Sequence, residues 1–259
     1  MTGLFAAAHR GFSLLELSIV LAVSGALVAS LVPAVATQIE SRQRRETVAR
    51  LDLALEALYG HAMTFGRLPC PDAFGSGDGR EDRDATEACT STEGFLPHVD
   101  LAVPGRDAWS RRLRYRVSSG DGADFAIADD GLCRADDRDL DLCERGALEV
   151  YTRGDNPATS AVEAKYWRKL ADQVPALIFS PGTGRAPGDN DAAWERLASG
   201  DEGENLDGDV RFVARDFAAA QSCQDNSDET VALCAFDDLL RWISPNVLMH
   251  RLVLAGRLP

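Results

Sequence analysis

The sequence predicts an α+β protein in which a long N-terminal helix precedes a loop-rich β-sheet head. Three observations favour this fold class: an uncharged run of 23 residues at positions 17–39, a helical stripe of apolar side chains after it, and several short β-type segments between turn residues. The 259 residues suffice for a membrane segment and one elaborated domain of about 200 residues.

The uncharged run is the first predicted element. At a rise of about 1.5 Å per residue it is long enough to cross about 30 Å of hydrocarbon. One acid, Glu16, lies at its edge, where burial in lipid would cost roughly 2.5 to 3.5 kcal/mol. A carboxylate at this position therefore needs either a positively charged partner or contact with water.

An amphipathic helix is predicted directly after this run. Its apolar residues recur at alternating spacings of three and four, which places them on one helical face. Gly66 and Pro69 end the helix. The stripe favours packing on a sheet over an independent coiled coil, because it covers little more than two heptads. Its members are Val48, Leu51, Leu55, Leu58, Ala62 and Phe65.

The remaining chain is predicted to form a sheet domain. Short β-type segments are bounded by Gly, Pro or Asp. A final helix is predicted over residues 245–255, with Ser244 as N-cap and Gly256 past its end. The aromatic residues Trp109, Tyr115 and Trp242 are predicted in the core, with ligand stacking as the alternative. The predicted strands are residues 113–117, 124–128, 148–152, 176–180 and 210–213.

Charge and cysteine usage restrict the functions that fit. With 41 acidic and 27 basic residues the formal net charge is −14, which disfavours nucleic-acid binding because phosphates need a basic surface. All six cysteines follow the uncharged run, and none is in a CxxC pair. This pattern favours disulfides in an oxidising compartment over zinc, since His61, His98 and His250 are scattered.

Proximity along the chain favours three local disulfides. Each would close a short Asp-rich loop that has little apolar content to order itself. Sequence alone does not fix the connectivity, and buried free thiols are the alternative. The favoured pairs are Cys70 with Cys89, Cys133 with Cys143, and Cys223 with Cys234.

Acidic loops raise the question of a metal. Residues 72–93, 129–144 and 201–209 are rich in Asp and Glu, and flexible loops of this kind supply the oxygen ligands that calcium prefers. None matches a full EF-hand loop, so solvated loops without a metal are the favoured interpretation and calcium binding is the alternative. The candidate calcium ligands are Asp201, Asn205, Asp207 and Asp209.

Motifs for catalysis are missing from the sequence. It contains no GxSxG, HExxH or GxxxxGK[ST] pattern, and the segment SPGTG at residues 180–184 lacks the lysine of a phosphate loop. We therefore predict no catalytic residue and no cofactor, with bound calcium as the alternative.

Residues 10–16 read Arg-Gly-Phe-Ser-Leu-Leu-Glu. This stretch resembles the cleavage and methylation signal of type IV prepilins and of the pseudopilins of type II secretion. The resemblance implies that a prepilin peptidase cuts between Gly11 and Phe12 and methylates the new terminal amine of Phe12. It also implies that Gly25 and Pro33 loosen the helix.

In a filament, Glu16 can neutralise the terminal amine of a neighbouring subunit, because a charge pair in a low dielectric is less costly than either lone ion. The alternative is that its carboxylate reaches the lipid headgroups near the helix end.

The resemblance implies a pilin-like organisation: a leader peptide at residues 1–11, a transmembrane helix at 12–39, its periplasmic continuation at 40–66, and a globular α+β head at 67–259. The long helix would pack on an antiparallel sheet with disulfide-stapled loops. The segments at 107–109, 113–115, 178–182 and 236–238, with Trp242, are similar to landmarks of pseudopilin heads. Ser110 stands where a glycine often follows the tryptophan.

The implied function is that of a minor pilin or pseudopilin, a structural subunit of a type IV pilus or a type II secretion-like machine. The implied partners are prepilin peptidase, other pilins or pseudopilins, and an inner-membrane assembly platform. The chain would span the inner membrane once, with its C-terminal head in the periplasm, and would enter a filament in the periplasm or at the cell surface.

A secretory signal is the alternative reading of the N-terminus. His9, Arg10, the apolar stretch and the Ala-Val-Ala at residues 34–36 fit a signal cleaved before Thr37, which would leave a secreted or anchored periplasmic binding domain. Glu16 fits such a signal poorly. Four arginines follow the uncharged run and only Arg10 shortly precedes it, so the positive-inside rule alone favours the opposite orientation. They are Arg42, Arg44, Arg45 and Arg50.

Overall fold

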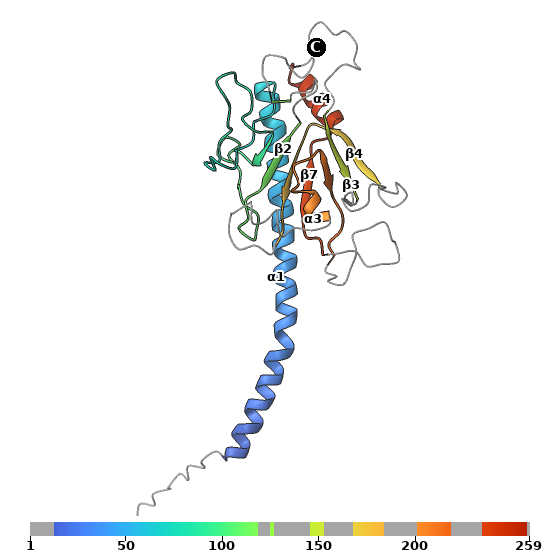
Figure 1. Ribbon diagram of the computed structural model, residues 1–259. Helices are drawn as coiled ribbons and strands as arrows, with labels where there is room; N and C mark the ends of the chain where they lie inside the picture. The colour runs from blue at the N-terminus through green and yellow to red at the C-terminus, as the bar shows by residue number, and fades with distance from the viewer. Residues whose placement is uncertain are drawn as a thin grey trace, which may run out of the picture. The chain divides into compact units, whose positions relative to one another are not determined.

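The computed structural model describes residues 13–118, 125–126, 146–152, 168–183, 201–218 and 235–257, without the side chains of residues 28–34 and 36. The chain divides into two compact units, Met1–Arg45 and Glu46–Pro259, each of which is described by itself below. The described elements mix helices with short strands, which confirms the α+β class (Figure 1). They are α1 (Leu14–Phe65), β1 (Glu93–Phe95), β2 (Arg114–Val117), β3 (Leu148–Tyr151), β4 (Lys169–Val174), β5 (Ala176–Ser180), α3 (Asp201–Glu204), β6 (Arg211–Val213), β7 (Leu239–Trp242) and α4 (Pro245–Leu254).

Helix α1 has 52 residues and continues through Gly25 and Pro33 without interruption. It ends at Phe65, as predicted, because Gly66 adopts the left-handed conformation (φ +72°) that closes many helices. Among the described residues, no helix combines the length and the apolarity that a membrane crossing requires.

The strands of the second unit form two sheets. The first has the order β1-β2-β5-β7, and all of its neighbouring strands are antiparallel. The second has the order β4-β3-β6, in which β3 is antiparallel to β4 and parallel to β6. The predicted antiparallel sheet is therefore confirmed, with one parallel pair in addition.

Strand β5 connects two cores because its side chains alternate between the faces of the first sheet. Ile178 packs with Leu51 and Leu58 of α1, whereas Leu177 and Phe179 pack with residues of the second sheet. Every residue of β5 is buried, as expected for a strand that is covered on both faces. Burial of each large aliphatic side chain contributes roughly 1.5 to 3 kcal/mol, so α1 is held to the first sheet mainly by apolar contacts.

The apolar stripe of α1 is confirmed in its centre and wrong at its end. Leu51, Leu58 and Ala62 are fully buried, but Phe65 is 56% exposed. The buried face of the helix includes Ala54 and His61 instead. The Phe65 ring lies outside the core and packs against the His61 ring, with the ring centroids 4.4 Å apart.

Four of the five predicted strands are present as β2, β3, β5 and β6. The prediction for residues 124–128 is wrong where it can be compared, since Phe125 and Ala126 form a turn. Both side chains are buried against the core, and Leu68 donates a backbone hydrogen bond to the carbonyl of Phe125 at 2.7 Å. Their apolar character reflects this burial rather than a strand. Strands β1, β4 and β7 were not predicted.

The predicted C-terminal helix is confirmed as α4, with Pro245 in its first turn. Ser244 occupies the N-cap position, but its side chain makes no capping hydrogen bond. Its backbone N–H donates to the hydroxyl of Tyr59 on α1 at 3.1 Å. Of the predicted core aromatics, Tyr115 is fully buried, whereas Trp109 and Trp242 are half-buried.

Candidate functional site

The start of α1 is stabilised by Ser13. Its hydroxyl accepts a hydrogen bond from the backbone N–H of Leu15 at 3.3 Å, and its carbonyl accepts one from Leu17 at 3.1 Å. Ser13 and Glu16 have the Ser-x-x-Glu spacing of a capping box, a signal that the sequence analysis missed. Glu16 is exposed in the first turn, where a carboxylate is favoured by the helix dipole. Gly11 and Phe12 lie outside the described residues.

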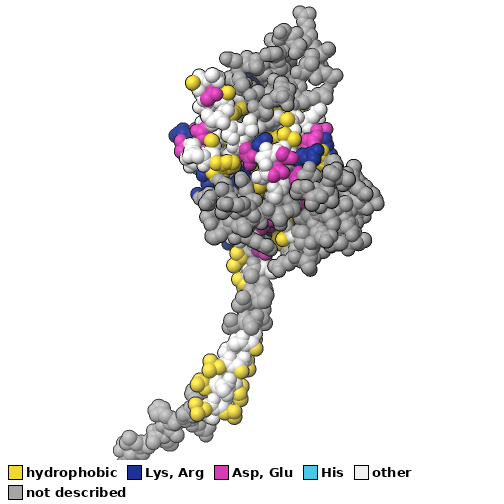
Figure 2. Space-filling view, viewed as in Figure 1, with side chains coloured by type: hydrophobic (Ala, Val, Ile, Leu, Met, Phe, Trp, Pro, Cys, Tyr) yellow, Lys and Arg dark blue, Asp and Glu magenta, His cyan; other side chains and the backbone are white. Residues whose placement is uncertain are grey.

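The first turns of α1 present an almost entirely apolar surface (Figure 2). Apart from Glu16, the polar residues of this stretch are Ser18 and Ser24. Their hydroxyls donate to carbonyls of the same helix, those of Leu15 and Val20, at 2.8 and 2.7 Å. The hydroxyls are therefore satisfied without water or a partner. The large side chains exposed here are Leu14, Leu15, Leu17, Ile19, Val20, Leu21, Val23 and Leu27.

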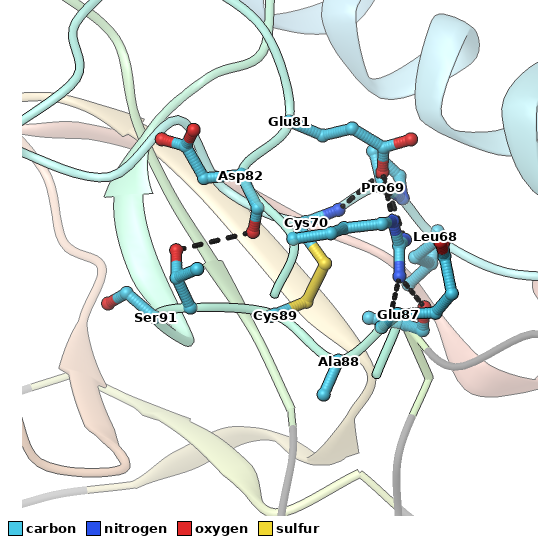
Figure 3. The surroundings of a disulfide bond; sticks show 12 residues. Leu68, Pro69, Cys70, Glu81, Asp82, Glu87, Ala88, Cys89 and Ser91 are labelled. Carbon is cyan, nitrogen blue, oxygen red and sulfur yellow. Dashed lines mark hydrogen bonds and ion pairs between the residues drawn. A yellow bond between two sulfur atoms is a disulfide. The ribbon is translucent and has the colours of Figure 1, made fainter. Parts of the chain in front are cut away.

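Cys70 and Cys89 form a disulfide, which confirms the first predicted pair (Figure 3). The two cysteines are separated by 19 positions in the sequence, and the disulfide closes the loop that directly follows α1. The other four predicted disulfide residues, Cys133, Cys143, Cys223 and Cys234, lie outside the described residues. Their pairing stays a prediction.

Glu81 lies at the centre of this loop (Figure 3). Its two carboxylate oxygens each accept a hydrogen bond from Arg67 at 2.9 Å, and one oxygen also accepts from Arg83 at 2.9 Å and from the backbone N–H of Cys70 at 3.1 Å. Burial raises the pKa of Glu81, but these hydrogen bonds outweigh it and lower the pKa to about 2. The carboxylate is thus held ionised beside the disulfide.

Two segments that are distant in sequence, residues 107–111 and 180–182, meet at the buried carboxyl group of Asp107. Its oxygens accept hydrogen bonds from the hydroxyl of Ser180 at 2.6 Å and from the backbone N–H groups of Trp109 and Arg111 at 2.9 and 2.8 Å. Burial raises the pKa of Asp107 in spite of these bonds. The hydroxyl of Ser180 also accepts from the N–H of Gly182 at 3.2 Å, so it is engaged in structure at the end of β5.

The loop that contains Asp107, residues 106–111, is bound to α1 by hydrogen bonds. Arg50 donates to the carbonyls of Arg106 and Asp107, both at 2.8 Å, and the N–H of Ala108 donates to the hydroxyl of Thr47 at 3.1 Å. Ser110 has φ +68°, a left-handed conformation that favours glycine. The backbone at this position is therefore glycine-like although the residue is serine.

The predicted calcium ligands do not form one site. Asp201 is buried and forms an ion pair with Arg215 at 2.6 Å. Asn205 is also buried, and its side-chain amide pairs with the N–H and C=O of Val213 at 2.7 and 3.1 Å, which occupies it as an edge cap of β6. Both residues thus have partners within the fold, and calcium binding by the predicted set stays a prediction.

Asp207 and Asp209 lie together, and Glu204 joins them in place of the buried pair. The three carboxylates offer oxygens within 4.8 Å of one another, a geometry that could hold a cation. Glu204 escaped sequence analysis because its place beside the two aspartates depends on the short helix α3 and the turn after it.

A second group combines Glu202 with Asp237 and Asp238, again with oxygens within 4.8 Å. Asp238 is buried and accepts a hydrogen bond from the amide of Asn205 at 2.8 Å. Burial raises the pKa of Asp238 well above its usual range, and the charges of Glu202 and Asp237 add to the effect. Asp237 accepts hydrogen bonds from the N–H and the hydroxyl of Thr183, the first at 2.8 Å. This group fixes the turn after β5 and favours a proton on Asp238.

Comparison of the chain with family models, with curated proteins and with solved structures finds no match.

Proposed function

We propose that the chain is a pilin-like structural subunit, a minor pilin or pseudopilin that is processed by prepilin peptidase and assembled through its N-terminal helix. The observation that carries this proposal is the order Arg10-Gly11-Phe12 with Glu16, followed directly by 23 uncharged residues. A processing site, a lone carboxylate and a lipid-length run in this order serve one purpose, which is to deliver an apolar helix into a membrane and then into a filament.

Helix α1 supports the proposal in two ways. Its first turns expose apolar side chains and leave no serine hydroxyl in need of water, which suits lipid or the helices of other subunits. Its second half buries Leu51 and Leu58 on the first sheet, so the same helix is an anchor at one end and part of a globular core at the other.

The proposed partners are prepilin peptidase, other pilins or pseudopilins, and an inner-membrane assembly platform. The proposed location is the inner membrane with a periplasmic head, then a filament in the periplasm or at the cell surface. The confirmed disulfide supports an oxidising compartment for the head.

A secreted or anchored binding domain is the second candidate, and the Ala-Val-Ala at residues 34–36 favours it. Cleavage before Thr37 would cut α1 in its interior, since the helix is continuous from Leu14 to Phe65. The pilin-like reading keeps the helix whole from its Ser13 cap onward.

Assembly is tested with Glu16→Gln in cells that contain prepilin peptidase, the other pilins or pseudopilins and the assembly platform. Gln keeps the capping-box spacing and removes only the charge, so a loss of function reports on charge pairing rather than on helix formation. We expect the variant to lose its leader and stay in the membrane, but to fall at least tenfold in sheared filament fractions. Glu40→Gln, a charge change farther along the same helix, is the matched control and should assemble normally. Normal incorporation of Glu16→Gln would refute the neutralisation role.

A further inference from the structure

Two arginines of α1 share a face just beyond the uncharged run. Arg42 and Arg45 are three residues apart, which places them on one side of the helix, and both side chains are exposed. Arg45 donates from Nε to the carbonyl of Ser41 at 3.2 Å, which leaves the rest of its guanidinium available to a further partner. Within the described part of the chain, neither arginine forms an ion pair with a carboxylate.

The acids nearest in sequence do not neutralise this face. Glu46 forms an ion pair with Arg50 at 2.5 Å, and Arg50 is itself bound to carbonyls of the Asp107 loop. Glu40 is the first residue after the uncharged run. Its single negative charge does not balance the two positive charges of Arg42 and Arg45, so the net charge of the three side chains is positive. The face therefore attracts anions.

Its distance from the uncharged run matches the depth of lipid phosphates. A helix rises about 1.5 Å per residue, so Arg42 and Arg45 follow Ile39 by roughly 4.5 and 9 Å. The polar layer of each leaflet is about 5 to 8 Å thick. Long arginine side chains can bend along the helix toward this layer, and guanidinium groups bind phosphate oxygens in pairs.

Topology does not account for these residues. In the orientation proposed above they lie outside the cytoplasm, where the positive-inside rule gives arginine no role. We propose that Arg42 and Arg45 form a phosphate-binding face for anionic phospholipid headgroups, which fixes the depth of α1 before assembly. This inference rests on the membrane anchoring in the proposed function.

The test uses the full chain reconstituted with equal amounts of phosphatidylglycerol and phosphatidylcholine, then repurified in limiting mild detergent. The measured quantity is the ratio of the two lipids that stay bound. We expect Arg42→Gln/Arg45→Gln to lower the preference for phosphatidylglycerol by about 5- to 25-fold, since each interfacial arginine contributes a factor of up to about five. Arg80→Gln/Arg168→Gln, two exposed arginines of the second unit, is the control with the same charge change.

Carbonate extraction of the same membranes tests membrane anchoring separately from the phosphate-binding face. Release of the wild-type chain at high pH would overturn membrane anchoring and this inference with it. Retention of the chain with an unchanged lipid ratio in Arg42→Gln/Arg45→Gln would overturn the phosphate-binding face alone. Loss of the preference in 10 mM inorganic phosphate would also contradict it, because it would mean that the face selects free phosphate over headgroups.

Discussion

Glu81 connects the end of α1 to the loop that follows, because its carboxylate binds Arg67, Arg83 and the backbone of Cys70 at the same time. Removing one member of such a network leaves buried charges without their partner, which is more costly than losing an exposed pair. At the scale of single residues, this carboxylate and that of Asp238 are expected to respond to pH in opposite directions.

For Glu81→Gln we expect the free energy of unfolding at pH 7 to fall by about 2 kcal/mol. The folded pKa of about 2 lies below the ordinary value of 4.5, so the ionised carboxylate stabilises the fold above pH 4.5 and this contribution is lost as the pH falls toward 2. The difference between wild type and variant should therefore narrow with acid in urea titrations of the head. Glu87→Gln, an exposed change in the same loop, should stay within about 0.5 kcal/mol of wild type. A Glu81→Gln deficit that is independent of pH would contradict the assignment.

Asp238 should show the opposite trend. Its folded pKa is raised, so its contribution to stability is fully present below the ordinary value of 3.8 and is lost as the pH rises through the folded pKa. Asp238→Asn keeps an acceptor for Asn205 and cannot ionise. We expect the variant to gain stability relative to wild type as the pH rises from 4 to 8, measured by chemical denaturation at each pH. Asp216→Asn, at an exposed position, is the control, and an equal profile for Asp238→Asn and wild type would show that Asp238 does not titrate in this range.

At the scale of elements, the Cys70 to Cys89 link restrains the loop that leaves α1. Closing a loop of this length removes unfolded-state entropy equivalent to about 3 kcal/mol in the chain-entropy model. The double variant Cys70→Ser/Cys89→Ser should therefore lower the free energy of unfolding by about 3 kcal/mol, which denaturant titration measures. A loss below about 1 kcal/mol would mean that Glu81 and its arginines order the loop without the disulfide.

The elements that sequence analysis predicted correctly are those whose signals are local. The signals for the Gly66 stop of α1, for the largely apolar strand β5 and for the Pro245 start of α4 come from neighbouring residues alone. Strand β4 was missed because its burial is slight and its sequence KLADQV has little β-type character. Residues 125–126 were misread for the opposite reason, since a buried turn and a strand have the same apolar composition.

The residues of the candidate site show the same difference between local signals, which sequence analysis detects, and tertiary contacts, which it does not. The Cys70 to Cys89 pair is close in sequence, and proximity predicted it. The candidate calcium ligands Asn205 and Asp201 have partners that only the tertiary fold provides, in Val213 and Arg215, and no local pattern indicates these contacts. Likewise, the contact between Asp107 and Ser180 joins residues 73 positions apart, and no local pattern indicates it.

At the scale of the whole molecule, the two units differ in surface chemistry. The first helix turns of the first unit expose mainly apolar side chains, whereas the second unit exposes acidic and basic side chains among apolar ones (Figure 2). Contiguous exposed apolar surface on a protein is typical of sites that contact lipid or other protein chains. In the function that we propose, a membrane and then a filament would cover this surface in turn.

The identity of the mature N-terminus tests this account most directly. The chain is expressed with prepilin peptidase, purified from membranes and analysed by mass spectrometry of its N-terminal peptide. We predict N-methylated Phe12 as the first residue, and Gly11→Asp should leave the leader attached. A mature chain that begins at Thr37 would contradict the account and establish the secretory signal, and a chain that keeps Met1 in the presence of active peptidase would contradict it as well.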